Sequence, residues 1–305
     1  MFLRPWNFVP HNTKIDFVAK RWWGFSATLV LTIATVVSLA LNGLNLGIDF
    51  KGGILIEAKA TQAVDMAALR GDLGSLGLGE VTLQEFGSPN DVLVLVQRQE
   101  GDENAQQRAV QLIREKMGTS YEYRRVEVVG PTVGKELFQA GILATLFAVL
   151  AIAIYVGFRF EWQFGVAAFT ATLHDVLVTV GLYSVFQLDF NLTAIAALLT
   201  LAGYSINDTV VVFDRIRETL RRHKATSLKD VINDSVNQTL SRTLMTAGVT
   251  LLALMPLLVS GGPTLFNFSI AITWGILVGT YSSIYVAASF LLYMPALRRI
   301  DLKKK

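Results

Sequence analysis

Apolar residues fill long stretches of this chain, and polar residues gather in the segments between them. Six stretches approach or exceed the roughly 20 residues that a helix needs to cross the hydrocarbon core of a bilayer. Because a helix satisfies its backbone hydrogen bonds internally, these stretches are expected to be transmembrane helices. They cover residues 23–44, 137–158, 164–186, 190–213, 243–259 and 265–296. The pattern predicts a polytopic α-helical membrane protein with six transmembrane helices.

The segment 45–136, between the first two stretches, has a different pattern. Short runs either alternate apolar and polar residues or repeat with the helical period. Their order is βαββαβ, which is that of an α+β ferredoxin-like domain, a fold that hosts many functions and by itself names none. The strands are expected at 54–60, 80–86, 91–97 and 121–129, the helices at 64–76 and 104–117, and a turn at 87–90.

Lysine and arginine residues lie at one side of the predicted spans, and cytoplasmic loops carry an excess of these residues. We therefore expect a cytoplasmic N-terminal segment at 1–22, a cytoplasmic loop at 214–242 and a cytoplasmic basic tail at 297–305, with 45–136 on the outer side. The basic residues are Arg4, Lys14, Lys20, Arg21, Arg159, Arg215, Arg217, Arg221, Arg222, Lys224, Lys229, Arg298, Arg299, Lys303, Lys304 and Lys305. The first span is longer than the apolar core of a usual signal peptide, so we expect it to be retained.

Part of the loop 214–242 has its own helical pattern. Leu228, Val231, Ile232, Val236 and Leu240 share one face at helical spacing. Two interpretations stay open. The segment is either a short amphipathic helix on the inner membrane surface or a solvated connector with basic anchors.

Composition supports a membrane protein and argues against several kinds of chemistry. Of the 305 residues, 52% are hydrophobic and 17% are charged, and cysteine is absent. The histidines His11, His174 and His223 show no metal-ligand spacing, so we expect no metal site. The Gly130–Lys135 run has too few residues between its glycines for a phosphate loop, and we interpret it as a hinge. The sequence shows no cofactor loop and no nucleophile–base arrangement, so we expect no cofactor, no catalytic residue and no enzyme activity. The net charge is +3 and the basic residues lie near membrane ends, which does not favour nucleic-acid binding.

One acidic residue interrupts the fourth apolar stretch, where Asn207 and Asp208 stand side by side. A carboxylate at membrane depth is costly and usually functional. Arg242 opens the next stretch, and both residues lie towards the same membrane face. We interpret Asp208 and Arg242 as a candidate charge pair and proton relay, because protonation of Asp208 would free the two helices to shift. The alternative is a static buried ion pair, which is weak evidence for stability.

Three other polar or small-residue features fall within or beside the spans. His174 and Asp175 lie near the middle of the third stretch, where they either carry protons or hold the packing by a hydrogen bond between helices. The segment 45–57 holds Gly47, Gly52 and Gly53, and we interpret it as a structural junction into the outer domain. Gly275 and Gly279 form a small-residue face for close helix contact.

Several of these segments, in this order, resemble the SecF family of protein-export membrane subunits, within the SecD/SecF family and the RND superfamily. The matching runs are GIDFKGG from Gly47, VGPTVGKEL from Val129, RFEWQFG from Arg159, HDV from His174, GYSINDTVVVFDRIRE from Gly203, QTLSRTL from Gln238 and GTYSSIYVA from Gly279. The resemblance covers nearly the whole chain, and the Asn207–Asp208 run is its most specific part.

The resemblance implies a subunit that pairs with SecD and uses the proton-motive force to promote preprotein translocation after the SecA motor has acted. It implies a bacterial cytoplasmic membrane location, association with the SecYEG channel and YajC, and contact with exported unfolded polypeptide and membrane lipid. It assigns Asp208 and Arg242 to the proton path. The competing hypotheses are half of an RND-type exporter of small molecules or lipids, and a translocon scaffold that uses no energy.

Overall fold

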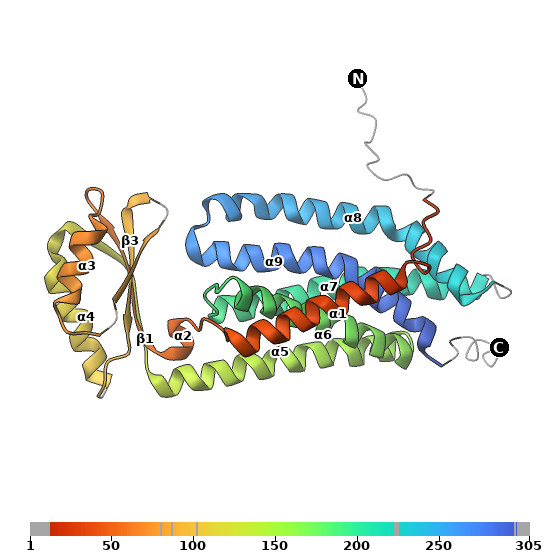
Figure 1. Cartoon of the computed structure of the whole chain (residues 1–305), viewed down its shortest axis with the longest axis horizontal. Helices are drawn as coiled ribbons and strands as arrows, with labels where there is room; N and C mark the ends of the chain where they lie inside the picture. The colour runs from red at the N-terminus through yellow and green to blue at the C-terminus, as the bar shows by residue number, and fades with distance from the viewer. Residues whose placement is uncertain are drawn as a thin grey trace, which may run out of the picture.

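The computed structural model describes residues 13–79, 81–86, 88–101, 103–222, 226–295 and 297. Within them, six long helices form an elongated bundle, and a small α+β domain stands beyond one end of it (Figure 1). All six are long and apolar enough to cross a membrane, as the sequence predicts. The bundle consists of α1 (Arg21–Leu41), α5 (Pro131–Arg159), α6 (Trp162–Val185), α7 (Leu192–Arg222), α8 (Leu228–Ser260) and α9 (Gly262–Ser282).

The connection between α7 and α8 differs from the sequence prediction. The helical pattern around Leu228–Leu240 is neither a separate surface helix nor a solvated connector, because it is the first part of the continuous helix α8. Its apolar residues Val231, Ile232 and Val236 are buried in the bundle core. Since α7 extends to Arg222, the connection between the two helices is far shorter than the predicted loop 214–242.

The last helix changes geometry before it ends. α9 continues into a π-helical segment, Ser283–Ala288, and a 3-10 turn follows at Leu291–Tyr293. The buried residues of the π-helical segment pack in the same core as the start of α6 and the inner end of α7. π-helical turns are rare and frequently lie at functional sites.

The outer domain has the predicted ferredoxin-like fold. Its antiparallel sheet has the strand order β2-β3-β1-β4, and α3 and α4 lie on one face (Figure 1). Val92, Val94 and Val96 point towards the helices, which explains the alternation in the sequence. The bounds are β1 (Gly53–Ala60), α3 (Met66–Gly74), β2 (Val81–Phe86), β3 (Ser88–Gln97), α4 (Glu103–Met117), the 3-10 turn Gly118–Ser120 and β4 (Tyr121–Val129). The turn predicted at 87–90 is wrong in part, because β3 already begins at Ser88.

A short junction joins the domain to the bundle. A one-turn helix, α2 (Ile48–Lys51), which the sequence pattern did not predict, is followed by Gly52 and Gly53 at φ values of 78° and 144°. Residues with a side chain rarely adopt such backbone angles, so the two glycines allow the chain to turn into β1. At Gly134 of α5 an added Cβ would lie 2.6 Å from the carbonyl oxygen of Phe50, so α5 and α2 are in backbone contact.

Several residues used in the sequence analysis lie outside the described residues. They are Arg4, His11, His223, Lys224, Arg298, Arg299, Lys303, Lys304 and Lys305, together with Glu80 and Gly87 of the predicted outer-domain strand and turn.

Candidate functional site

Asp208 lies at the middle of α7, the helix that packs against α5, α6, α8 and α9. The residue is only 3% exposed. Oγ1 of Thr246 of α8 lies 3.5 Å from Oδ1 of Asp208, which is a long hydrogen bond, and the same hydroxyl is closer to the carbonyl oxygens of Thr243 (2.9 Å) and Arg242 (3.1 Å) in its own helix. The second carboxylate oxygen, Oδ2, is buried and has no hydrogen-bond partner in the structure. An unpaired polar atom at this depth is costly, so Asp208 differs in this respect from a fully paired buried carboxylate.

Arg242 does not form the direct ion pair with Asp208 that the sequence analysis considered. Across the described part of the chain, no ion pair within 4.0 Å joins the two residues, and the Arg242 side chain is exposed on α8. Thr246, one helical turn further along α8, lies opposite the carboxylate instead. Arg242 remains within electrostatic range of Asp208.

The neighbours of Asp208 on α7 do not provide a hydrogen bond to its carboxylate in the described structure either. Asn207 is exposed on the outside of the helix, away from the buried carboxylate. Tyr204 and Ser205 precede Asp208 by about one helical turn of α7. The Tyr204 hydroxyl is buried without a partner, and Ser205 donates to a different acid, Asp175 of α6.

Asp175 is the centre of a second buried polar cluster. It is 0% exposed, and its Oδ2 accepts hydrogen bonds from Ser205 of α7 at 2.6 Å and Ser282 of α9 at 2.7 Å. Its Oδ1 lies 3.0 Å from Nδ1 of His174. The sequence indicated His174 and Asp175 but gave no signal that Ser205 and Ser282 would donate to Asp175.

The small-residue face of α9 serves packing within this chain. At Gly275 an added Cβ would lie 2.3 Å from a methyl group of Leu201 of α7. At Gly279 it would lie 3.5 Å from Oδ2 of Asp175. The two glycines therefore allow α9 to approach α7 and the Asp175 cluster closely.

The junction 45–53 binds the outer end of α7. Oδ2 of Asp49 accepts a hydrogen bond of 2.8 Å from the backbone N–H of Leu192, the first residue of α7. The Gly47 N–H donates to the Phe190 carbonyl at 2.8 Å, and Asn45 donates its side-chain amide to Asp189 at 2.9 Å. Lys51 is near enough to Asp189 for their charges to attract each other. The predicted structural role of this segment thus includes fixing the start of the helix that carries Asp208.

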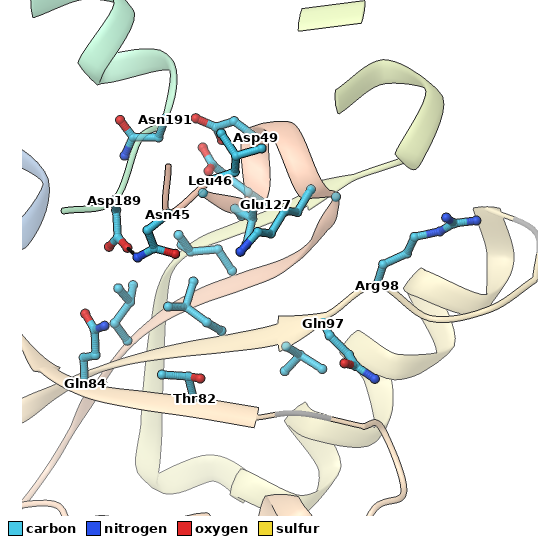
Figure 2. A pocket seen from close by; sticks show the side chains of 18 of the residues that line it. Asn45, Leu46, Asp49, Thr82, Gln84, Gln97, Arg98, Glu127, Asp189 and Asn191 are labelled. Carbon is cyan, nitrogen blue, oxygen red and sulfur yellow. Dashed lines mark hydrogen bonds between the residues drawn. The ribbon is translucent and has the colours of Figure 1, made fainter. Parts of the chain in front are cut away.

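A cleft of about 820 Å³ lies between this junction, the open face of the sheet and the loop before α7 (Figure 2). Leu55, Leu93 and Leu95 line it together with polar side chains such as Gln84 and Glu127. Burial raises the pKa of the Asp189 carboxyl above its ordinary value, although Lys51 and the bond from Asn45 oppose the shift. The mixed lining does not suit a large apolar ligand.

No group of three or more histidine or acidic side chains that could hold a metal comes together among the described residues. The polar features of the bundle are instead isolated carboxylates with hydroxyl partners. Such groups can accept and release protons and hydrogen bonds.

Fold and site together define a polytopic membrane protein of six long helices, with one ferredoxin-like domain inserted after the first and a buried carboxylate in the central helix. The family profile described as protein export membrane protein SecD/SecF, C-terminal, matches residues 109–296, and the SecD/SecF GG motif matches residues 37–64. The chain belongs to the SecD/SecF family of protein-export membrane proteins.

Curated relatives match this chain over 95% of its length. The protein translocase subunit SecF of Rickettsia felis is 42% identical over 295 residues, which cover 95% of each chain. That of Rickettsia bellii is 40% identical and covers 95% of this chain and 97% of its own length.

Two solved structures show the same architecture. The crystal structure of SecDF, a translocon-associated membrane protein from Thermus thermophilus, is 36% identical with a TM-score of 0.78 over 94% of this chain. A SecDF structure in the super-membrane-facing form is also 36% identical, with a TM-score of 0.69 over 95% of this chain. This chain spans 39% and 40% of the length of those two chains.

Proposed function

We propose that this chain is the SecF subunit of a Sec protein-export complex and that, with SecD, it uses the proton-motive force to promote translocation after the SecA motor has acted. Asp208 is the proton-accepting residue, and Arg242 modulates its charge. The observation that carries the proposal is the carboxylate of Asp208, buried in the central helix with one oxygen unpartnered. A carboxylate placed so can exist in two protonation states that favour different helix arrangements.

The relay is incomplete within this chain. Arg242 and Asn207 are both exposed, on neighbouring helices α8 and α7. α8 also exposes large apolar side chains, among them Leu244, Met245 and Val249. Lipid can cover the apolar side chains, but an exposed arginine in a membrane helix calls for a protein partner. The solved SecDF chains are more than twice as long as this one, which supports SecD as that partner.

The remaining assignments belong to the same proposal. The protein lies in the bacterial cytoplasmic membrane with both termini in the cytoplasm and the ferredoxin-like domain outside, and it associates with the SecYEG channel, YajC and exported unfolded polypeptide. SecA is engaged only indirectly. The positions of Arg159, Arg215 and Arg217 at the bundle end opposite the outer domain support this orientation.

The two alternatives predict different features. An exporter of small molecules or lipids needs a wide apolar cleft, whereas the cleft beside the outer domain is lined by polar as well as apolar residues. A scaffold that uses no energy predicts that neutral substitutes for Asp208 leave translocation unchanged.

The test is reconstitution of the complex in vesicles with Asp208→Asn, followed by preprotein translocation with and without an imposed proton gradient. We expect stimulation by the gradient to be lost while basal, ATP-driven translocation persists. Asp214→Asn is the matched control, because Asp214 lies on the same helix and is exposed. Undiminished stimulation in a correctly assembled Asp208→Asn complex would rule out the mechanism.

A further inference from the structure

The carboxylate of Asp175 joins three helices at one buried point. Its Oδ2 receives Ser205 from α7 and Ser282 from α9, and its own helix α6 supplies His174 to Oδ1. Each of these side chains is at most 7% exposed. Both carboxylate oxygens therefore have side-chain partners, and those of Oδ2 come from two other helices.

The donors and acceptors in this cluster indicate one protonation state. Two hydroxyl donors meet at one oxygen, which suits an ionised carboxylate because that group only accepts hydrogen bonds. Nε2 of His174 is buried and has no partner in the structure, which suits a neutral ring whose Nδ1–H donates to Oδ1. A proton placed on Oδ2 would turn that acceptor into a donor, so one serine could no longer donate to it; the Ser282 hydroxyl also lies 3.3 Å from the Gly279 carbonyl oxygen.

The positions of Ser205 and Ser282 connect the cluster to Asp208 on α7 and to the end of α9. Ser205 lies three residues before Asp208, on the same side of α7. Ser282 is the last residue of α9 before the π-helical segment Ser283–Ala288. A π-helical turn shifts the register of every residue after it, so the bond from Ser282 fixes α9 at the place where its register changes.

We infer that Asp175 is a positioning residue for the proton-accepting site: by holding Ser205 and Ser282, it fixes α7 against α6 and α9 so that Asp208 faces Thr246. This inference rests on the proposed function. It assigns no proton transfer to Asp175 itself. The charged or titratable groups at the two acids in the described residues are His174 at Asp175 and Arg242 at Asp208.

The test compares two adjacent buried serines. Ser282→Ala removes a bond to Asp175, whereas Ser283→Ala removes only a bond to the Thr280 carbonyl of the same helix. Each variant is reconstituted with its partner subunits, and translocation is measured over a series of pH values at a constant imposed gradient. Assembly is checked by copurification of the partner subunits.

For Ser282→Ala we expect gradient stimulation to fall by about tenfold or more, the change that follows loss of one buried hydrogen bond to a charged group. The pH of half-maximal stimulation should also move, because Asp208 then titrates in a changed position. Ser283→Ala should match wild type in both respects. Asp175→Asn, which keeps the size of the side chain, should act in the same direction as Ser282→Ala.

A double-mutant cycle separates positioning from general packing. If Asp175 acts through the position of Asp208, the effects of Ser282→Ala and Thr246→Val on stimulation will not be additive. Two results would overturn the inference: an unmoved pH midpoint with additive effects, or equal loss in Ser282→Ala and Ser283→Ala. Failure of the proposed function has a different signature, since either wild type would show no gradient stimulation or Asp208→Asn would retain it.

Discussion

The carboxylate of Asp49 accepts a hydrogen bond of 2.8 Å from the backbone N–H of Leu192. Asp49 belongs to the junction that continues through Gly52 and Gly53 into the first strand of the outer domain. Leu192 begins α7, whose middle carries Asp208. A single side chain therefore links the segment entering the outer domain to the helix with the buried acid. A shift of α7 along its axis would act directly on this junction.

We predict that Asp49→Ala weakens the coupling between the proton gradient and translocation. The first N–H groups of a helix have no partner within it, and loss of a capping acceptor costs about 1 kcal/mol, or roughly a fivefold change in an equilibrium. Asp49→Asn should retain most of the coupling, because an amide oxygen can also accept the bond. Translocation with and without an imposed gradient measures the effect.

Asp65→Ala provides the control for local stability. Asp65 caps α3 inside the outer domain by accepting from the Ala67 and Ala68 N–H groups, and it does not join the domain to the bundle. Comparable loss of coupling in Asp65→Ala and Asp49→Ala would show that the link to Leu192 is not used.

A second prediction concerns the close approach of α5 and α6. At Gly165 an added Cβ would lie 2.8 Å from Cα of Gly157 and 2.9 Å from the Ala153 carbonyl oxygen. Both neighbours are backbone atoms, which cannot turn aside. We expect Gly165→Ala to destabilise the bundle by about 1–3 kcal/mol, as overpacking does in other cores. The apparent unfolding temperature of the purified protein in detergent should fall.

The matched variant is Gly248→Ala on α8, where an added Cβ meets nothing within 4 Å. Alanine is the better helix former, so this change should leave the unfolding temperature unchanged or raise it. Equal destabilisation by Gly165→Ala and Gly248→Ala would contradict the packing argument.

The elements that the sequence predicted well are those set by local patterns. The apolar runs located all six long helices, and the strands expected at 54–60 and 121–129 lie within one residue of the bounds of β1 and β4. A charge in an apolar run is visible without any structure, which is why Asp208 was identified. By contrast, α2 has only four residues, too few for a helical period to be recognised.

The contacts that were missed are tertiary. α8 looked like two segments because its first half carries polar residues such as Asp230 and Asn233, and only packing shows that its other face is buried. The pairing of Asp175 with Ser205 and Ser282 brings together three helices, one of which lies more than 100 residues further along the chain. Helical periodicity defines a face but does not say which partner meets it. For the same reason, the sequence analysis expected Arg242 against Asp208, whereas the structure places Thr246 there.

A third prediction tests the contact between Thr246 and Asp208. Thr246→Val removes the hydroxyl and keeps the shape of the side chain, so the buried carboxylate loses its recorded donor. We expect gradient-stimulated translocation to fall about fivefold, whereas Thr246→Ser should retain it. Thr250→Val is the control, because the Thr250 hydroxyl bonds only to the Thr246 carbonyl in its own helix. Loss of stimulation in Thr250→Val to the same extent would indicate a general effect on α8.

The last prediction concerns Asp16, in the segment that precedes α1. Its Oδ1 accepts hydrogen bonds from the Ala19 N–H at 2.8 Å and from Asn233 of α8 at 2.7 Å. These bonds, the first being the larger cause, hold the pKa of Asp16 below its ordinary value, and Lys229 adds to the shift. Because the folded state favours the ionised form, this contribution to stability is fully present above the ordinary pKa of about 4 and is lost as the pH falls through the lowered pKa.

Hydrogen exchange of residues 14–20, expressed as protection factors between pH 3 and pH 6, measures this contribution. Protection in wild type should decrease towards the acid end of that range. Asp16→Asn should have lower protection at pH 6 and little dependence on pH, because its amide does not ionise. Asp234→Asn, a change on the exposed side of α8, should behave as wild type. An acid-induced loss of protection that persists in Asp16→Asn would show that a group other than Asp16 fixes this segment to the bundle.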